Sequence, residues 1–242
     1  MTSQKIVHTA KDYEKHYEEF YKDEDYDIEW RLLGAKDKVQ NIITLCSSLN
    51  PQNMLDIGGG DGIVGKILAE REFCKQMYFI ELSTSAINLI KSQTIPYLVE
   101  AIKYQGVEIP YEDNKFDLAV CTHVIEHVEN PRVLLNEMKR VAKYCFFEVP
   151  LEDNFNASPN FVWSDTGHIN FYNPRTFKFL LQSCGFEVMD MKITLPSLQA
   201  HLYAGNKFEN TIKYNIKKGL LGVNANLAAS LFTYHFAVLC KC

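Results

Sequence analysis

The sequence predicts an α/β fold, a doubly wound domain in which helices cover both faces of a mostly parallel sheet. Short apolar runs alternate with helical patterns of about ten to fifteen residues, as expected of repeated βαβ units. A glycine-rich turn follows the first of these apolar runs. The length of 242 residues is enough for one large domain and short for two full ones.

The N-terminal part is predicted to be helical. Residues 11–26 are rich in tyrosine and charge, which indicates a helix followed by an acidic turn. From Trp30 to Leu49 apolar residues recur at helical spacing, so a second helix with one buried stripe is expected. Pro51 ends this helix, and Asn53–Ile57 is predicted to be the first strand.

The rest of the chain alternates between strands and helices. Further strands are predicted at Met77–Glu81, Tyr97–Tyr104, Phe116–Thr122, Tyr144–Val149, Phe186–Ile193 and Thr233–Lys241. Helices are predicted at 61–70, at 83–94, and after the Asn-Pro pairs at 130–131 and 173–174. In each pair asparagine suits the N-cap and proline suits the first helical position.

Composition and charge argue against several classes of protein. A formal net charge of −5 disfavours a protein that binds nucleic acid through its phosphates. No apolar run approaches the ~20 residues of a membrane span, and the polar N-terminus lacks the apolar core of a signal peptide. The seven cysteines form no CxxC pair, which disfavours a zinc ribbon. We expect a cytoplasmic protein with no nucleic-acid or membrane partner.

The glycine-rich turn allows two interpretations. Gly60, Gly62 and Gly65 match the Gly-x-Gly-x-x-Gly fingerprint of dinucleotide-binding folds. From Asp56 the same segment is Asp-x-Gly-x-Gly-x-Gly, a nucleotide loop that binds no phosphate. Both interpretations require an acidic residue at the end of the second strand to bind ribose hydroxyls, and Glu81 lies there.

Asp56 favours the second interpretation. A carboxylate at the end of the first strand would repel the diphosphate of a dinucleotide. S-adenosylmethionine has no phosphate and carries an ammonium and a sulfonium group, so a carboxylate would attract it. Asp56 could instead be a turn residue that caps the next helix, but the neighbouring glycines already supply the turn. The sequence therefore predicts S-adenosylmethionine as the cofactor.

Four segments carry a more specific pattern. They are "MLDIGGGDG" (54–62), "YFIELS" (78–83), "GVEIPYEDNKFDLAVCTHVIEHVENP" (106–131) and "GHINFYNPRTFKFLLQSCGFEV" (167–188). Together they resemble the class I S-adenosylmethionine-dependent methyltransferases, in particular the broad UbiE/COQ5-like group (methyltransferase types 11 and 23). The resemblance implies a Rossmann-like sheet of seven strands with the last strand antiparallel, and it says little about the methyl acceptor.

The resemblance also implies which residues bind the cofactor. By position they are Asp56, Gly58, Gly59, Gly60, Glu81, Leu82, Gln105, Gly106, Val107, Thr122 and His123. Asp56 and the glycines would line the methionine part, Glu81 would bind the ribose hydroxyls, and Leu82 would pack on the adenine. Many relatives have aspartate where Gln105 stands, but a glutamine amide oxygen can still accept from the adenine amino group.

Two histidines are candidate catalytic residues. Methyl transfer depends mainly on positioning, and a base is needed only when the acceptor is protonated. His168 is the first candidate because in this fold its loop faces the methyl group; alternatively it anchors that loop. His123 is the second candidate, or it only lines the pocket. Glu152 and Asp165 are weaker candidates, expected to be solvated loop acids.

The expected organisation has four parts. Residues 1–49 form a helical cap and first helix, 50–194 the cofactor-binding core, 195–232 an insertion on the acceptor side, and 233–242 the final strand. In the cap, Tyr13, Tyr17 and Tyr21 lie at helical spacing. They form either a lid over the cofactor or one face of an amphipathic helix packed on the sheet.

The activity expected on this basis is O-methylation of a small polar or sugar-linked metabolite, with no metal ion. N- or C-methylation of another small molecule and a non-catalytic S-adenosylmethionine-binding partner are alternatives. A fourth interpretation comes from His123-Val-Ile-Glu126-His127, which matches the H-x-x-E-H motif of inverted zinc proteases. In that case both histidines would bind zinc from one helix and Glu126 would act as the base.

Overall fold

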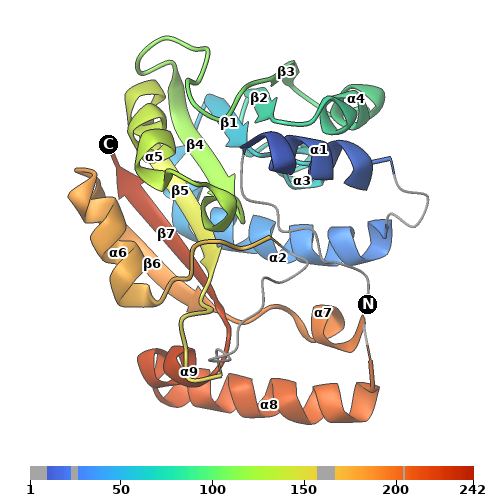
Figure 1. Cartoon of the computed structure of the whole chain (residues 1–242), viewed down its shortest axis with the longest axis vertical. Coiled ribbons are helices and arrows are strands. Elements are labelled where there is room, and N and C mark those ends of the chain that lie inside the picture. Colours follow the sequence, from blue (N-terminus) through green and yellow to red (C-terminus); the bar gives the residue numbers. More distant parts are fainter. Residues whose placement is uncertain (1–9, 23–26, 157–166, 204) are drawn as a thin grey trace.

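The structure, a computed structural model, describes residues 10–22, 27–156, 167–203 and 205–242. At its centre lies a seven-stranded sheet in the order β3-β2-β1-β4-β5-β7-β6, with helices on both faces (Figure 1). The strands are β1 (Asn53–Ile57), β2 (Gln76–Glu81), β3 (Leu98–Lys103), β4 (Phe116–Thr122), β5 (Ala142–Pro150), β6 (Glu187–Thr194) and β7 (His235–Lys241).

Helices connect these strands, and the helices between β6 and β7 lie at the lower end of the molecule in Figure 1. The α-helices are α1 (Ala10–Phe20), α2 (Ile28–Cys46), α3 (Ile63–Glu70), α4 (Thr84–Ser92), α5 (Pro131–Val141), α6 (Pro174–Ser183), α7 (Leu198–Tyr203), α8 (Lys207–Val223) and α9 (Ala225–Leu231). Two short 3₁₀ helices are η1 (Ser47–Leu49) and η2 (Ile125–His127). No helix among the described residues is long and apolar enough to cross a bilayer.

The sheet confirms the predicted fold class. Strands β1 to β5 pair in parallel, and β7 runs antiparallel between β5 and β6. All seven predicted strands are present; β1 and β4 have the predicted bounds, and the others differ by one or two residues at an end. The strand order reverses between β1 and β4, and in such sheets ligands bind at this point, beyond the carboxyl ends of the strands.

Two apolar layers hold the sheet in place. On one face, Met138 of α5 and Phe177 of α6 are fully buried against the sheet. On the other face, Ile42 of α2, Leu68 of α3 and Ile90 of α4 are fully buried. The helical spacing of apolar residues therefore predicted α2, α5 and α6 correctly, because each of these helices presents one apolar stripe to the sheet.

Local differences from the sequence predictions have clear causes. Helix α3 begins at Ile63 rather than at residue 61, because Gly62 adopts a left-handed conformation with φ of +78°. Asn173 is the expected N-cap and also forms a capping box with Thr176, whereas the Asn130 side chain forms no capping hydrogen bond. The segment 195–232 contains α7, α8 and α9.

The core packing generates the first testable prediction. Phe79 of β2 is fully buried and lies against the glycine turn and α3, since a Cβ on Gly59 would come within 2.7 Å of its ring and one on Gly65 within 2.3 Å. Phe79→Ala should lower the free energy of unfolding by about 3–5 kcal/mol, measured by urea denaturation. Phe179→Ala, at an exposed position of α6, is the control and should change it by less than about 0.5 kcal/mol. Equal effects of the two substitutions would contradict this packing.

Candidate active site

A cavity of about 870 Å³ lies at the switch point between β1 and β4. Its walls come from the carboxyl ends of the strands, from α1 and α2, and from the segment that leads into α7. All eleven residues predicted to bind the cofactor line this cavity: Asp56, Gly58, Gly59, Gly60, Glu81, Leu82, Gln105, Gly106, Val107, Thr122 and His123. His168 also lines it. The volume is within the usual range of small-molecule sites.

The turn after β1 requires glycine at two positions. Gly58 and Gly60 have φ of +66° and +57°, a region that favours glycine. A Cβ on Gly58 would lie 2.4 Å from a methyl group of Val124, and one on Gly60 would lie 2.6 Å from the hydroxyl of Tyr21. The glycines therefore let the walls of the cavity approach the turn closely.

Two carboxyl groups beside this turn are buried without full compensation. Burial raises the pKa of Asp56 to about 7, although Lys38 opposes the shift, and burial likewise raises the pKa of Glu81 to about 7. Asp56 Oδ2 has no hydrogen-bond partner among the described residues. Such groups fit a ligand that carries cationic groups and hydroxyls, and they disfavour a diphosphate.

The adenine side predicted from the sequence is built by the ends of β2 and β3. Tyr104 N donates to the carbonyl oxygen of Glu81 at 3.0 Å, which ties the two strand ends together. Gly106 has φ of +75°, and a Cβ there would lie 3.3 Å from the Leu82 side chain. Leu82, Gln105 and Gly106 therefore form one continuous wall, with the exposed Val107 at its rim.

Helix α2 contributes two cations that the sequence predictions missed. The Arg31 guanidinium is paired with Asp61, next to the glycine turn. Lys38 lines the cavity and forms no hydrogen bond or ion pair with another described residue, and burial lowers its pKa. Lys38 lies between Ala35 and Ile42 on the buried stripe of α2, so a lysine that interrupts an apolar stripe was the available signal.

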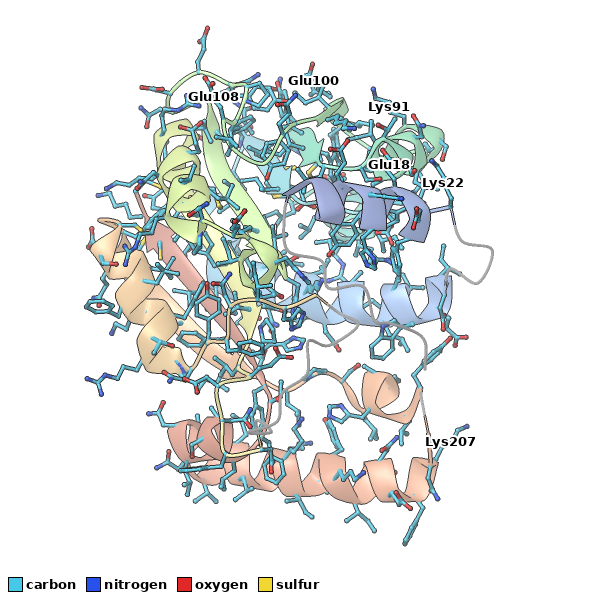
Figure 2. All side chains as sticks on the ribbon, in the orientation of Figure 1. Glu18, Lys22, Lys91, Glu100, Glu108 and Lys207 are labelled. Carbon is cyan, nitrogen blue, oxygen red and sulfur yellow. The ribbon has the colours of Figure 1, made fainter. Side chains whose placement is uncertain are left out.

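Helix α1 closes the cavity from above the glycine turn. Tyr17 and Tyr21 line the cavity, and Tyr21 is buried. The Glu18 carboxylate accepts from the backbone nitrogen of Ser85 at 3.1 Å, which fastens α1 to the start of α4 (Figure 2). Burial alone would raise the pKa of Glu18, but hydrogen bonds from Ser85 and Thr84 lower it to about 2. The position of Tyr17 and Tyr21 in the cavity wall agrees with the interpretation of α1 as a lid over the cofactor. The Tyr13 side chain lies outside the described part of the chain.

His123 lies between two fully buried carboxylates. Its Nδ1 is 3.2 Å from Glu126 Oε1, and its Nε2 is 3.3 Å from Glu148 Oε1. Burial and Lys38 would lower the pKa of His123, but the two carboxylates raise it above the ordinary value. His123 also has φ of +56°, which is uncommon for a residue with a Cβ. Both ring nitrogens of His123 therefore face carboxylates, which favour its protonated form.

Glu148 anchors this arrangement to two other elements, α2 and β7. It accepts a hydrogen bond from Asn41 of α2 at 2.8 Å and contacts His235 Nδ1 of β7 at 3.1 Å. Burial would raise its pKa, but His123 and His235 hold it well below the ordinary value. Sequence reasoning missed Glu148 and His235; the signal was a single acid within the apolar run of β5.

His168 has a different environment. Its Nδ1 lies 2.7 Å from Glu152 Oε2, so Glu152 is not the solvated loop acid expected from the sequence. No described residue bonds to its Nε2. The centre of the His127 ring lies 4.7 Å from that of the His168 ring, and His127 also lines the cavity. Asp165, the remaining acid candidate, lies outside the described residues.

Among the described residues, two groups of side chains could hold a metal ion. They are His123, Glu148 and His235, and separately Glu126, His127 and His168; within each group the ligand atoms lie within 4.8 Å of one another. The zinc-protease interpretation needs His123 and His127 to share one ion from a helix. They fall in different groups, and η2 is a single 3₁₀ turn, so the structure does not provide that arrangement.

Comparison with known proteins gives the class of the protein. The model of a family described as "Methyltransferase domain" matches residues 29–190. The chain belongs to this family, and its sheet has the topology of the Rossmann-like class I methyltransferases. The family, the enzyme class and the cofactor S-adenosylmethionine that the sequence predicted are thereby confirmed.

Curated relatives match only part of the chain. One is a mitochondrial ubiquinone biosynthesis O-methyltransferase of Candida albicans, 33% identical over 93 residues, which are 36% of this chain and 28% of that protein. Another is norajmaline N-methyltransferase of Rauvolfia serpentina, 33% identical over 99 residues, which are 39% of this chain and 34% of that protein. The chain thus spans about a third or less of these relatives, which act on different atoms.

Solved structures agree on the fold. A chain from the complex between the Haloferax volcanii Trm112 methyltransferase activator and a methyltransferase superposes with a TM-score of 0.66 at 12% identity, over 93% of this chain and 96% of that chain. Phosphoethanolamine N-methyltransferase 2 of Haemonchus contortus, solved with S-adenosyl-L-methionine, gives 0.61 at 15% identity, over 93% and 59%. At these identities the likeness concerns the fold.

The raised pKa values of Asp56 and Glu81 predict pH-dependent cofactor binding. Both groups titrate near pH 7, so they are mostly ionised at pH 8 and mostly protonated at pH 6. A carboxylate that binds a cation or a hydroxyl must be ionised, so affinity for S-adenosylmethionine should fall about tenfold or more from pH 8 to pH 6. Isothermal titration calorimetry at both pH values checks this, with circular dichroism to confirm folding.

Glu81→Gln and a second ligand complete this experiment. Glu81→Gln should weaken binding at pH 8 and reduce the pH dependence, because one of the two titrating groups is gone. NAD should not bind, since Asp56 repels a diphosphate. Affinity that does not change with pH, or binding of NAD instead of S-adenosylmethionine, would show that these carboxyl groups do not receive the cofactor.

Lys38 predicts a separate effect on cofactor affinity. It is the cavity-lining lysine, and the carboxylate of S-adenosylmethionine is an anion that needs such a partner. Lys38→Met should weaken binding about tenfold or more, as expected for loss of a hydrogen bond to a charged group. Lys36→Met, at an exposed position of the same helix, is the control and should bind like the wild type. Equal affinity of the two variants for S-adenosylmethionine would show that Lys38 does not bind the cofactor.

Proposed function

We propose that the protein transfers a methyl group to a hydroxyl oxygen of a small polar or sugar-linked metabolite, with His168 as the general base. The observation that carries this proposal is the pair His168–Glu152 in the wall of the cavity, with 2.7 Å between Nδ1 and Oε2. S-adenosylmethionine supplies an electrophilic methyl group when bound. What the chain must supply is a deprotonated oxygen, held in line and away from water.

His168 is suited to accept a proton. With Nδ1–H donating to Glu152, the neutral ring presents the lone pair of Nε2, which no described residue occupies. Glu152 would stabilise the imidazolium that forms when the proton arrives, as an acid does in other histidine–carboxylate pairs. Burial lowers the pKa of His127 beside it, which disfavours a competing positive charge there.

His123 is less suited to the same role. Its pKa is raised, and both of its ring nitrogens face carboxylates that compete for its protons. We therefore propose that His123 compensates the negative charges of Glu126 and Glu148 beside the cofactor residues. The remaining predicted cofactor residues keep the roles that the family resemblance gave them.

The acceptor would enter between the cofactor residues and the segment 195–232. Pro196 and Ala200 of this segment line the cavity, which supports the expectation that it shapes the acceptor pocket. The O-methyltransferase activity named for the Candida albicans relative supports oxygen as the target, and the Rauvolfia serpentina N-methyltransferase makes nitrogen the alternative. Arg31 and Tyr21 also line the cavity and lie against Gly60 of the glycine turn.

The test is the pH profile of the reaction. With a panel of sugar, polyol, phenol and amine acceptors, S-adenosylhomocysteine formation identifies a substrate. His168→Ala should then lower kcat about 10²- to 10⁴-fold and remove the acid limb of the profile, while S-adenosylmethionine affinity stays unchanged. Glu152→Gln should give a smaller loss in the same direction.

Asp153→Asn, an exposed acid next to Glu152, serves as the control and should retain activity. A His168→Ala enzyme with unchanged turnover across pH would contradict the role of this base. Methylation of amines alone would replace oxygen by nitrogen as the target. Tight S-adenosylmethionine binding without transfer to any acceptor would favour the non-catalytic alternative.

A further inference from the structure

Helix α8 exposes an apolar stripe to solvent. It has 17 residues and none of them is buried. Phe208, Ile212, Ile216 and Val223 lie on one side of the helix and are exposed, Phe208 by 74% and Val223 by 85%. Leu227 at the start of α9 extends the row. We call these five residues the α8 stripe; single exposed apolar residues are ordinary, but a continuous row on one helix indicates a binding surface.

The opposite side of α8 holds the helix on the protein. Tyr234 OH donates to the carbonyl oxygen of Lys217 at 2.7 Å, and the Tyr214 ring lies 5.2 Å from that of His201. Leu220 packs at the edge of the core. In Figure 2 the helix, with Lys207 labelled at its start, lies at the lower border of the molecule. One row of its side chains extends downward, away from the rest of the protein. The α8 stripe is therefore presented outward by a fixed helix.

The charge of α8 is opposite to that of the whole chain. Four lysines and one glutamate occur in the helix, whereas the net charge of the chain is −5. Lys207, Lys213 and Lys218 are exposed. The helix thus combines bulky apolar side chains with flanking cations on a protein that is otherwise acidic. This combination is typical of helices that lie in the plane of a membrane surface.

We propose that the α8 stripe binds the surface of a membrane rich in anionic lipids. Phe208, Ile212 and Ile216 would enter the boundary between headgroups and acyl chains, and the lysines would contact anionic headgroups. Each lysine near such a surface adds about fivefold to the partition constant. The absence of a span-length apolar run, on which the expectation of no membrane partner rested, concerns spanning and not surface contact. The proposal is independent of the methyl acceptor.

The charges disfavour a second copy of this chain as the occupant. Pairing two α8 stripes would bring the lysines of both helices together, with only Glu209 in each helix to offset them. Like charges in contact oppose such an association, while an anionic surface attracts all of the lysines at once. Charge complementarity therefore favours the lipid surface.

The test is flotation of the full-length chain with lipid vesicles. The protein should float with vesicles of equal parts phosphatidylcholine and phosphatidylglycerol, and at least about fivefold less with phosphatidylcholine alone. Ile212→Ser/Ile216→Ser should reduce the bound fraction about tenfold or more, because two apolar side chains no longer enter the lipid. Lys213→Gln/Lys218→Gln should weaken binding to the anionic vesicles only. Phe179→Ser, at an exposed position of α6, should bind like the wild type.

The outcomes separate the possible occupants. Flotation with anionic vesicles that depends on Ile212 and Ile216 supports the proposal. Absence of flotation overturns it, as does equal loss in Phe179→Ser. Light scattering that shows a dimer, lost in Ile212→Ser/Ile216→Ser without any vesicle binding, overturns it in favour of a second copy. Both sets of substitutions lie at exposed positions, and circular dichroism confirms that they fold.

Discussion

Four buried carboxyl groups at one edge of the sheet are the constraint on which the rest of the site depends. They belong to Asp56, Glu81, Glu126 and Glu148, and burying such groups is unfavourable unless charges or hydrogen bonds compensate them. Glu126 and Glu148 are compensated within the chain by His123 and keep low pKa values. Asp56 and Glu81 are not, and their pKa values rise to about 7. The fold thus keeps two acids ready for a ligand that supplies the missing cation and hydroxyl groups.

This difference divides the cavity into two halves. The half at β1 and β2 holds uncompensated acids and a glycine turn, as an S-adenosylmethionine-binding site requires. The half at β4, β5 and β7 holds His123 and His235, whose ring nitrogens contact carboxylates. The His168–Glu152 pair lies in this half as well. Lys38 is close to acids of both halves, since it affects the pKa of Asp56 and is affected by Glu148. A charge that enters one half therefore affects the other through Lys38, which interacts with acids of both.

Sequence patterns predicted the sheet well and the site only in part. The strands β1, β2, β4, β5 and β7 are mostly buried and apolar, so their positions followed from the apolar runs. The cofactor residues followed from a motif confined to strand ends. Lys38 escaped because it sits on a helix with otherwise ordinary spacing, and Glu148 because it sits inside a strand. Their importance arises from elements far apart in the chain, such as Asn41 and His235, and local patterns do not contain that information. The outward face of α8 was likewise invisible before its neighbours were known.

The attachment of α1 has a consequence for where this domain can be cut. Residues 29–190 suffice to define the family, and the sheet itself begins at β1. Yet Tyr17 and Tyr21, which form the roof of the cavity, precede that range, and Glu18 joins α1 to the turn that follows Glu81. A segment that begins at residue 29 therefore keeps every strand of the sheet but loses the tyrosines that cover the cavity.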